Sequence, residues 1–132
     1  MIYLDSNVFI YACLSSDAIG ERSRNLLRGV ERGEVDAASS TLSFDEIVWA
    51  VKKYRTMEQA ISAGEAFINM PKLSLVPVDE TVIRYAIEVM KRYGFDPRDS
   101  IHTASAILCR AEALMSSDPH FDRLKELQRR QL

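Results

Sequence analysis

Long apolar runs, cysteines and glycine-rich loops are all scarce in this sequence. No apolar run approaches the roughly 18 residues that a membrane-spanning helix needs, and Met1 leads directly into an expected strand, which leaves no room for a signal peptide. Only two cysteines are present, Cys13 and Cys109, and both fall within apolar helical patterns. We therefore expect buried, reduced thiols in a cytoplasmic protein, without a disulfide framework or a zinc site.

The charge balance also argues against a domain that binds nucleic acid over its whole surface. The 132 residues include 17 basic and 19 acidic side chains, a formal net charge of −2, whereas domains that bind nucleic acid over their whole surface are usually basic. A local basic rim stays compatible with this balance. Hydrophobic residues make up 47% and charged residues 27% of the chain, which is typical of a globular protein with a core. No linker or repeat interrupts the pattern, so we expect residues 1–132 to form one domain.

Expected strands and helices alternate along the chain. The strands are expected at residues 2–4, 35–39, 73–78 and 113–117, and the helices at residues 8–14, 19–30, 41–54, 56–70, 80–93 and 96–111. This alternation predicts an α/β fold with a mostly parallel sheet that is covered on both faces. A last short helix is expected to begin at Asp118. The polar tail after Leu124 fits either a frayed helix or a late edge strand.

Apolar side chains at helical spacing predict which helix faces are buried. The inward stripe expected for residues 41–54 comprises Phe44, Ile47, Val51 and Tyr54. The next helix begins with the capping box of Thr56 and Gln59. Its expected inward stripe comprises Met57, Ala60, Ile61, Gly64, Phe67 and Ile68.

Four acidic residues stand at strand ends or in the first turns of helices. They are Asp5, Glu46, Asp99 and Asp118, and each is expected near the same edge of the sheet, where ligands bind in open α/β folds. Two carboxylates about 4 Å apart repel by roughly 4 kcal/mol at an effective dielectric constant near 20. Such a cluster therefore needs protons or a cation. Hard oxygen ligands suit Mg²⁺ or Mn²⁺.

Each of these acids also has a local interpretation. Asp5 and Asp118 fit helix N-caps, and Asp99 fits the positive end of its helix, which would also keep it ionised for metal binding. Glu46 could close a capping box, and Asp45 competes with it, because adjacent helical positions point about 100° apart. We favour Glu46, because it borders the apolar stripe and Asp45 points away from it.

Four further residues lie close to these acids in the sequence. Ser6 follows the first acid, and its hydroxyl fits either a hydrogen bond to a carboxylate or metal-bound water, or a local turn bond. Asp122 lies one turn beyond the last acid and fits either a solvated surface charge or an outer residue that supports the ligands, and we keep it as a candidate for the second role. His102 is expected mainly to pack in the core, and His120 is assigned no role.

Four segments resemble the motifs of PIN-domain nucleases, in the same order and at matching spacing. They are Ile2-Tyr3-Leu4-Asp5-Ser6-Asn7-Val8, Ser43-Phe44-Asp45-Glu46-Ile47, Asp99-Ser100-Ile101-His102-Thr103-Ala104-Ser105-Ala106 and Ser116-Ser117-Asp118-Pro119-His120-Phe121-Asp122. The resemblance implies a three-layer α/β/α fold and a Mg²⁺- or Mn²⁺-dependent ribonuclease, in many members the toxin of a VapC-type toxin–antitoxin pair. It also implies that Asp5, Glu46, Asp99 and Asp118 hold the metal, and that hydrolysis leaves a 5′-phosphate and a 3′-hydroxyl. The expected partners are RNA, an antitoxin protein and a second copy of the chain.

Substrate contact is expected from basic side chains, because an acid cluster alone repels phosphate. A basic rim would make RNA binding salt-dependent. Arg98 is the favoured contact, because it adjoins Asp99. The other candidates are Lys52, Lys53, Arg55, Lys91 and Arg92.

Two other functions fit parts of the sequence. An Asp-based phosphoryl-transfer protein would use Asp5 as its nucleophile, but phosphatases of that kind place a second Asp two residues later, where this chain has Asn7. A catalytically silent PIN-like interaction module would retain the fold, but it has no need of four converging carboxylates. The acid set therefore favours the nuclease.

Overall fold

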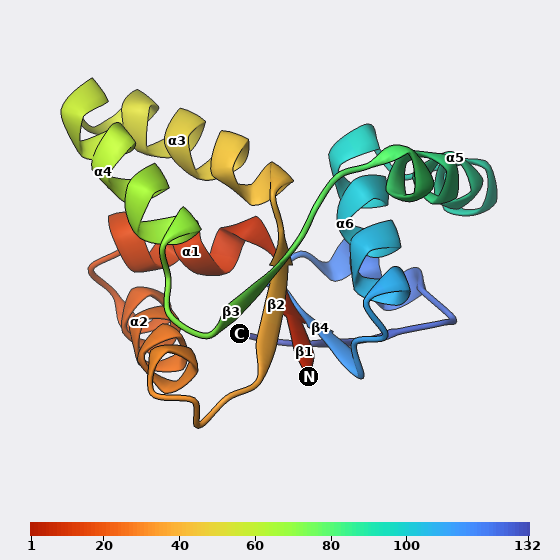
Figure 1. Cartoon of the computed structure of the whole chain (residues 1–132), viewed down its shortest axis with the longest axis horizontal. Helices are drawn as coiled ribbons and strands as arrows, with labels where there is room; N and C mark the ends of the chain where they lie inside the picture. The colour runs from red at the N-terminus through yellow and green to blue at the C-terminus, as the bar shows by residue number, and fades with distance from the viewer.

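The computed structural model describes all 132 residues and contains a five-stranded sheet (Figure 1). Every neighbouring pair of strands is parallel, and the order across the sheet is β3-β2-β1-β4-β5. The polar tail after Leu124 ends in the edge strand β5, so the strand alternative is the one adopted. The strands are β1 (Ile2–Leu4), β2 (Ala37–Ser40), β3 (Leu73–Val76), β4 (Ala113–Met115) and β5 (Gln128–Arg130).

Helices cover the sheet on both faces, so the three-layer α/β/α fold is confirmed. Figure 1 shows α1 to α4 on one side of the strands and α5 and α6 on the other. No helix combines the length and the apolar character that crossing a membrane requires. The helices are α1 (Ser6–Leu14), α2 (Ala18–Glu31), α3 (Leu42–Tyr54), α4 (Met57–Ile68), α5 (Glu80–Tyr93), α6 (Pro97–Leu108) and the short 3₁₀-helix η1 (Pro119–Arg123).

The central strand β1 divides its side chains between two cores, as alternation along a strand requires. Ile2 and Leu4 join the apolar cluster beneath α1 to α4. Tyr3 joins the cluster on the side of α5, α6 and η1. Because β1 is buried on both faces, its sequence is apolar at every position.

The strand order places a topological switch point between β1 and β4. From β1 the chain builds β2 and β3 on one side, and it later builds β4 and β5 on the other. Ligands of open α/β sheets bind beyond the carboxyl ends of the strands at such a point. Asp5 directly follows β1 and Ser116 directly follows β4, so the fold brings these two residues to the switch point.

Local interactions set the ends of two helices. Thr56 Oγ1 accepts a hydrogen bond from Gln59 N at 3.1 Å, and Thr56 N donates to Gln59 Oε1 at 3.3 Å, which completes the predicted capping box. Gly94 ends α5 with a φ of 67°, in the left-handed region that glycine adopts without strain. The helix α6 is shorter than expected and ends at Leu108.

The predicted inward stripes of α3 and α4 are only partly correct. The middle of each stripe is buried, but five side chains predicted to face inward are exposed. Figure 1 shows the reason: the α3–α4 pair extends away from the sheet, and no further layer covers its outer surface. The exposed residues are Phe44, Tyr54, Met57, Ile61 and Ile68.

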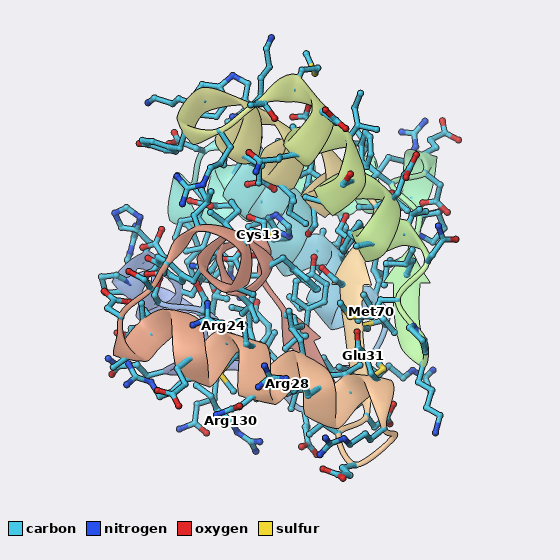
Figure 2. All side chains as sticks on the ribbon, turned by 90° about the vertical axis from the view of Figure 1, so that its left-hand side faces the viewer. Cys13, Arg24, Arg28, Glu31, Met70 and Arg130 are labelled. Atoms are coloured by element: carbon cyan, nitrogen blue, oxygen red, sulfur yellow. The ribbon has the colours of Figure 1, made fainter.

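The prediction of buried cysteines is wrong for Cys13. Its side chain is exposed near the C-terminal end of α1, which extends beyond the sheet, and it lies on the side of the molecule that faces the viewer in Figure 2. Cys109 is partly buried. Both thiols are free.

Candidate functional site

Asp5 lies at the carboxyl end of β1 and is only 6% exposed. Its Oδ1 accepts a 2.7 Å hydrogen bond from Ser6 N, which makes Asp5 the N-cap of α1. Its Oδ2 accepts a 2.7 Å hydrogen bond from Ser116 Oγ, just after β4. The same carboxylate therefore caps a helix and fills the switch point between the two strands.

Glu46 reaches the same place from α3. Its Oε2 accepts a hydrogen bond from Ser6 Oγ at 3.0 Å, and its Oε1 lies 2.5 Å from His102 Nε2. Asp45, the competing acid, is exposed and forms an ion pair with Arg98 at 3.5 Å. Of the two adjacent carboxylates, Glu46 is therefore the one that points into the cluster.

Asp99 and Asp118 form the outer part of the cluster. One ligand atom from each lies within 4.8 Å of the other and of a ring nitrogen of His120. Asp118 Oδ1 accepts a 2.9 Å hydrogen bond from His120 N, and Asp118 N donates to Ser116 Oγ at 3.0 Å. His120, which had no role in the sequence interpretation, is thus placed beside two of the four acids.

His102 has a larger part in the cluster than its sequence suggested. The ring is 1% exposed, as packing in the core requires, but its Nε2 also lies 3.6 Å from Asp5 Oδ1 and contacts Glu46. Its Nδ1 lies 2.7 Å from the hydroxyl oxygen of Tyr3. The one signal in the sequence was its position one turn beyond Asp99 on α6, which gave no information about Tyr3 or Glu46.

Asp122 lies outside the cluster and reaches it through another side chain. Its two oxygens accept hydrogen bonds from Arg129 Nε and Nη2 at 2.8 and 3.0 Å. Arg129 Nη1 also donates to the carbonyl oxygen of Ser116 at 3.0 Å. Asp122 therefore helps to fix the loop after β4 rather than contacting the other acids itself.

The surroundings oppose complete ionisation of the acids. Burial raises the pKa of Asp5, although the nearby charge of His102 counteracts this. Burial, followed by the charges of Asp118 and Asp5, raises the pKa of Asp99 to about 6. Burial is the largest single influence on Glu46 and opposes its ionisation, but the hydrogen bond and charge of His102, the hydrogen bond from Ser6 and the charge of Arg98 together outweigh it and lower the pKa of Glu46. Negative charge is therefore compensated at Glu46 and in excess around Asp99.

His102 supplies a positive charge to the inner part of the cluster. Burial lowers its pKa, but the hydrogen bond to Glu46 and the charges of Asp5 and Glu46 together raise it above its usual value. In the outer part, where Asp99 and Asp118 meet, the basic group beside the acids is the exposed ring of His120, whose Nδ1 lies 3.1 Å from Asp118 Oδ1, and the buried ring of His102 has no counterpart there. Carboxylate oxygens with uncompensated charge are the donor set that a hard divalent cation takes. The residues present therefore fit such an ion.

A cleft of about 460 Å³ opens beside the acids, between the N-terminal half of α3 and the start of α6. The side chain of Arg98 is 63% exposed at this cleft and is the basic group that lines it. The lining residues are Glu46, Asp96, Pro97, Arg98 and Asp99.

Comparison with known families gives one match. The model of a family described as PIN domain matches residues 2–127. No curated protein matches the chain.

Solved structures with a similar fold cover nearly the whole chain. VapBC2 from Rickettsia felis, bound to a DNA fragment from its promoter, is 22% identical with a TM-score of 0.74, covering 99% of this chain and 98% of the other. VapC20 from Mycobacterium tuberculosis, a sarcin-ricin loop cleaving toxin, is 13% identical with a TM-score of 0.76, covering 96% and 98%. FitAcB from Neisseria gonorrhoeae is 18% identical with a TM-score of 0.71, covering 98% and 96%. At these identities the likeness concerns the fold.

Proposed function

Because this chain belongs to the PIN domain family, we propose that it is a Mg²⁺- or Mn²⁺-dependent endoribonuclease that acts as the toxin of a toxin–antitoxin pair. The observation that carries the proposal is the gathering of four acids from separate segments at the switch point of the sheet. They are Asp5, Glu46, Asp99 and Asp118. The fold shared with VapC20, a toxin that cleaves the sarcin-ricin loop, supports the choice of RNA as the substrate.

The four acids hold the divalent cation in this proposal. A bound cation of this kind polarises a phosphate oxygen and lowers the pKa of a water ligand. Ser116 fixes one oxygen of Asp5, while Ser6 and His102 each fix one oxygen of Glu46. The protein thus orients the carboxylates before substrate arrives, which avoids reorganising them during the reaction.

Arg98 contacts the RNA backbone in this proposal. It lines the cleft next to Asp99, and its guanidinium is exposed and held only by a long contact to Asp45. A cation at this rim offsets the repulsion between the acids and a phosphate. The substrate is cellular RNA, so the enzyme acts in the cytoplasm.

Two separate apolar stripes serve protein partners in this proposal. Met57, Ile61 and Ile68 are half exposed on α4, and we assign them to an amphipathic segment of the antitoxin. Ile83, Ile87 and Met90 are exposed at helical spacing on α5, on the opposite side of the sheet (Figure 1). Such a stripe pairs with its own copy about a two-fold axis, and we assign it to a homodimer.

The decisive experiment compares wild type with Asp5→Asn and Asp99→Asn on labelled RNA in Mn²⁺, before and after EDTA. We expect cleavage by wild type that EDTA stops, 5′-phosphate products, and a loss of about 100-fold or more in each variant, as for other groups that stabilise developing charge. Asp36→Asn is the matched control, because Asp36 is an exposed acid just before β2, at the other edge of the sheet. RNA binding without cleavage would instead support the interaction module.

Two further readouts do not depend on cleavage products. Mg²⁺ should raise the unfolding temperature of wild type and not of Asp99→Asn, because only the native site binds the ion. Expression of wild type should arrest growth, whereas both Asn variants should not. Growth arrest by both variants would remove the proposed catalytic roles.

A further inference from the structure

Two aromatic rings on α3 are exposed and share one lysine. Trp49 is 60% exposed and Tyr54 is 62% exposed, so neither ring contributes much to the core. Lys53 Nζ lies 5.2 Å from the centroid of the Trp49 ring and 5.4 Å from that of Tyr54. We call these three residues the aromatic platform.

We propose that the aromatic platform binds unpaired nucleotides of a single-stranded RNA. Exposed rings stack on nucleobases of any sequence, and lysines beside them attract the phosphates. This inference rests on the proposed function, because it assigns to the same enzyme a substrate site away from the acids. It also sets the preferred substrate class: RNA with unpaired bases next to the cleaved bond.

The platform lies on the same side of α3 as the acid cluster. Trp49 is three residues and Lys53 seven residues after Glu46, and these spacings return to one face of an α-helix. At about 1.5 Å per residue, Lys53 is about 10 Å along the helix axis from Glu46. A strand bound at the acids can therefore continue along α3 onto the platform.

A pocket extends the platform toward α1. Ile10, Tyr11 and Leu14 of α1 line this cavity of about 320 Å³, together with Ser15, Tyr54 and Arg55. Its volume is at the lower end of the range for small-molecule sites. The apolar wall suits a base, and Arg55 at the rim suits a phosphate.

Tyr11 connects this pocket to the acid cluster. Its hydroxyl lies 3.2 Å from Ser117 Oγ, and Ser117 directly precedes Asp118. α1 begins at the switch point, α3 follows the neighbouring strand β2, and the two helices pack against each other (Figure 1). The pocket and the platform thus lie along the two helices that lead away from the acids.

The charges on this surface favour a nucleic acid over a protein partner. Lys52, Lys53 and Arg55 cluster at the end of α3, and the ion pairs of the chain involve other basic residues. Three unpaired cations around exposed rings complement a phosphate backbone. The apolar stripe on α5 differs from this surface, because the charged residues that flank the stripe are paired with each other, as Arg84–Glu80 and Lys91–Glu88.

The test uses the fact that Trp49 is the only tryptophan in the chain. The Asp99→Asn variant, which leaves RNA intact under the proposed function, is titrated with a single-stranded oligouridine and with an RNA duplex of equal length. We expect saturable quenching of Trp49 fluorescence by the single strand and little by the duplex, whose bases are already stacked. Equal quenching by the duplex, or none by the single strand, overturns the proposal.

Substitutions in the same background measure the contribution of each group, with labelled oligouridine and fluorescence anisotropy. Trp49→Ala should raise Kd about 5- to 150-fold, the range for loss of one stacked base, and Trp49→Phe should restore most of the affinity. Lys53→Ala should lower the slope of log Kd against log salt by about one. Arg22→Ala, an exposed cation on α2, is the matched control and should leave Kd and the slope unchanged.

The failure of this inference differs from the failure of the proposed function. If wild type cleaves RNA and Trp49→Ala leaves Kd, KM and cleavage unchanged, only the platform is refuted. If RNA quenches the Trp49 fluorescence of the wild type, but the wild type never cleaves RNA in Mn²⁺, the platform stands and the proposed nuclease activity is refuted. Conversion of a dimer to a monomer by Trp49→Ala with unchanged RNA affinity would identify the surface as a protein interface and overturn the inference.

Discussion

His102 Nε2 lies 2.5 Å from Glu46 Oε1, although α6 and α3 supply these residues from positions 56 apart in the chain. The other ring nitrogen of His102 lies 2.7 Å from the hydroxyl oxygen of Tyr3. A buried imidazole with a partner at both nitrogens has little freedom to rotate, so it fixes the orientation of the Glu46 carboxylate. His102 therefore links the core between the sheet and α5, α6 and η1, to which Tyr3 belongs, with the acid cluster at the carboxyl edge of the sheet.

Replacing His102 with Ala should impair both stability and activity. It leaves the Tyr3 hydroxyl and the Glu46 carboxylate without this partner, which should cost about 1–3 kcal/mol of unfolding free energy and lower kcat in RNA cleavage. Tyr3→Phe keeps the ring and removes one hydrogen bond, so it should have the smaller effect on both quantities. Urea unfolding and cleavage kinetics measure the two effects. Normal kcat in His102→Ala would contradict the positioning role.

The raised pKa of Asp99 predicts how the metal-free protein responds to pH. Its folded value of about 6 exceeds the ordinary value of 3.8, so the folded state binds more protons than the unfolded state between these values. Stability from this group is therefore fully present below about pH 4 and is lost as pH rises through about 6. The pKa difference corresponds to about 3 kcal/mol at most, and solvent screening at this partly buried position reduces the expected effect to about 1–2 kcal/mol.

The variant Asp99→Asn tests whether the ionised Asp99 carboxylate destabilises the metal-free protein as pH rises. Without metal it should be more stable than wild type at pH 7.5, because it removes the excess charge, and about equally stable at pH 4. Unfolding by urea at the two pH values, in EDTA, provides the measurement. Lower stability of Asp99→Asn at pH 7.5 would show that the carboxylate is stabilising and that the cluster needs no cation.

Arg98→Ala should weaken RNA binding without affecting stability. The ion pair with Asp45 is exposed on both sides, and such pairs contribute about 0–1 kcal/mol. Loss of one phosphate contact should reduce the salt dependence of log Kd by about one. Arg84→Ala is the control, because Arg84 forms a similarly exposed pair with Glu80 on α5. An unchanged affinity across the salt titration would exclude Arg98 from the RNA site.

Arg129→Met should loosen the loop that carries Asp118. Arg129 is 13% exposed and joins Asp122 to the carbonyl oxygen of Ser116, so its loss should cost about 1–3 kcal/mol and lower cleavage. Asp122→Asn should cost less, because Asp122 is 56% exposed and Arg129 keeps its bond to the backbone. Thermal unfolding and cleavage rates of the two variants provide the measurement. Equal effects of both substitutions would place Asp122 in the site itself.

The sequence by itself determined those features whose causes are local. The capping box at Thr56 and the glycine at Gly94 set helix ends through bonds within a few residues. The alternation of strands and helices predicted a parallel sheet, and a parallel sheet already implies that acids after its strands meet at one edge. Asp5, Glu46, Asp99 and Asp118 could therefore be chosen before their distances were known.

Only the tertiary structure decided which surfaces are covered and which partners meet. Phe44, Met57 and Ile61 fit an inward stripe by spacing, yet they are exposed because no layer lies over the α3–α4 pair. His102 resembled a packing residue because its partners Tyr3 and Glu46 lie 99 and 56 positions away. The tail became a strand through pairing with β4. Burial and hydrogen-bond partners depend on segments brought together by folding, and periodicity within one helix carries no information about them.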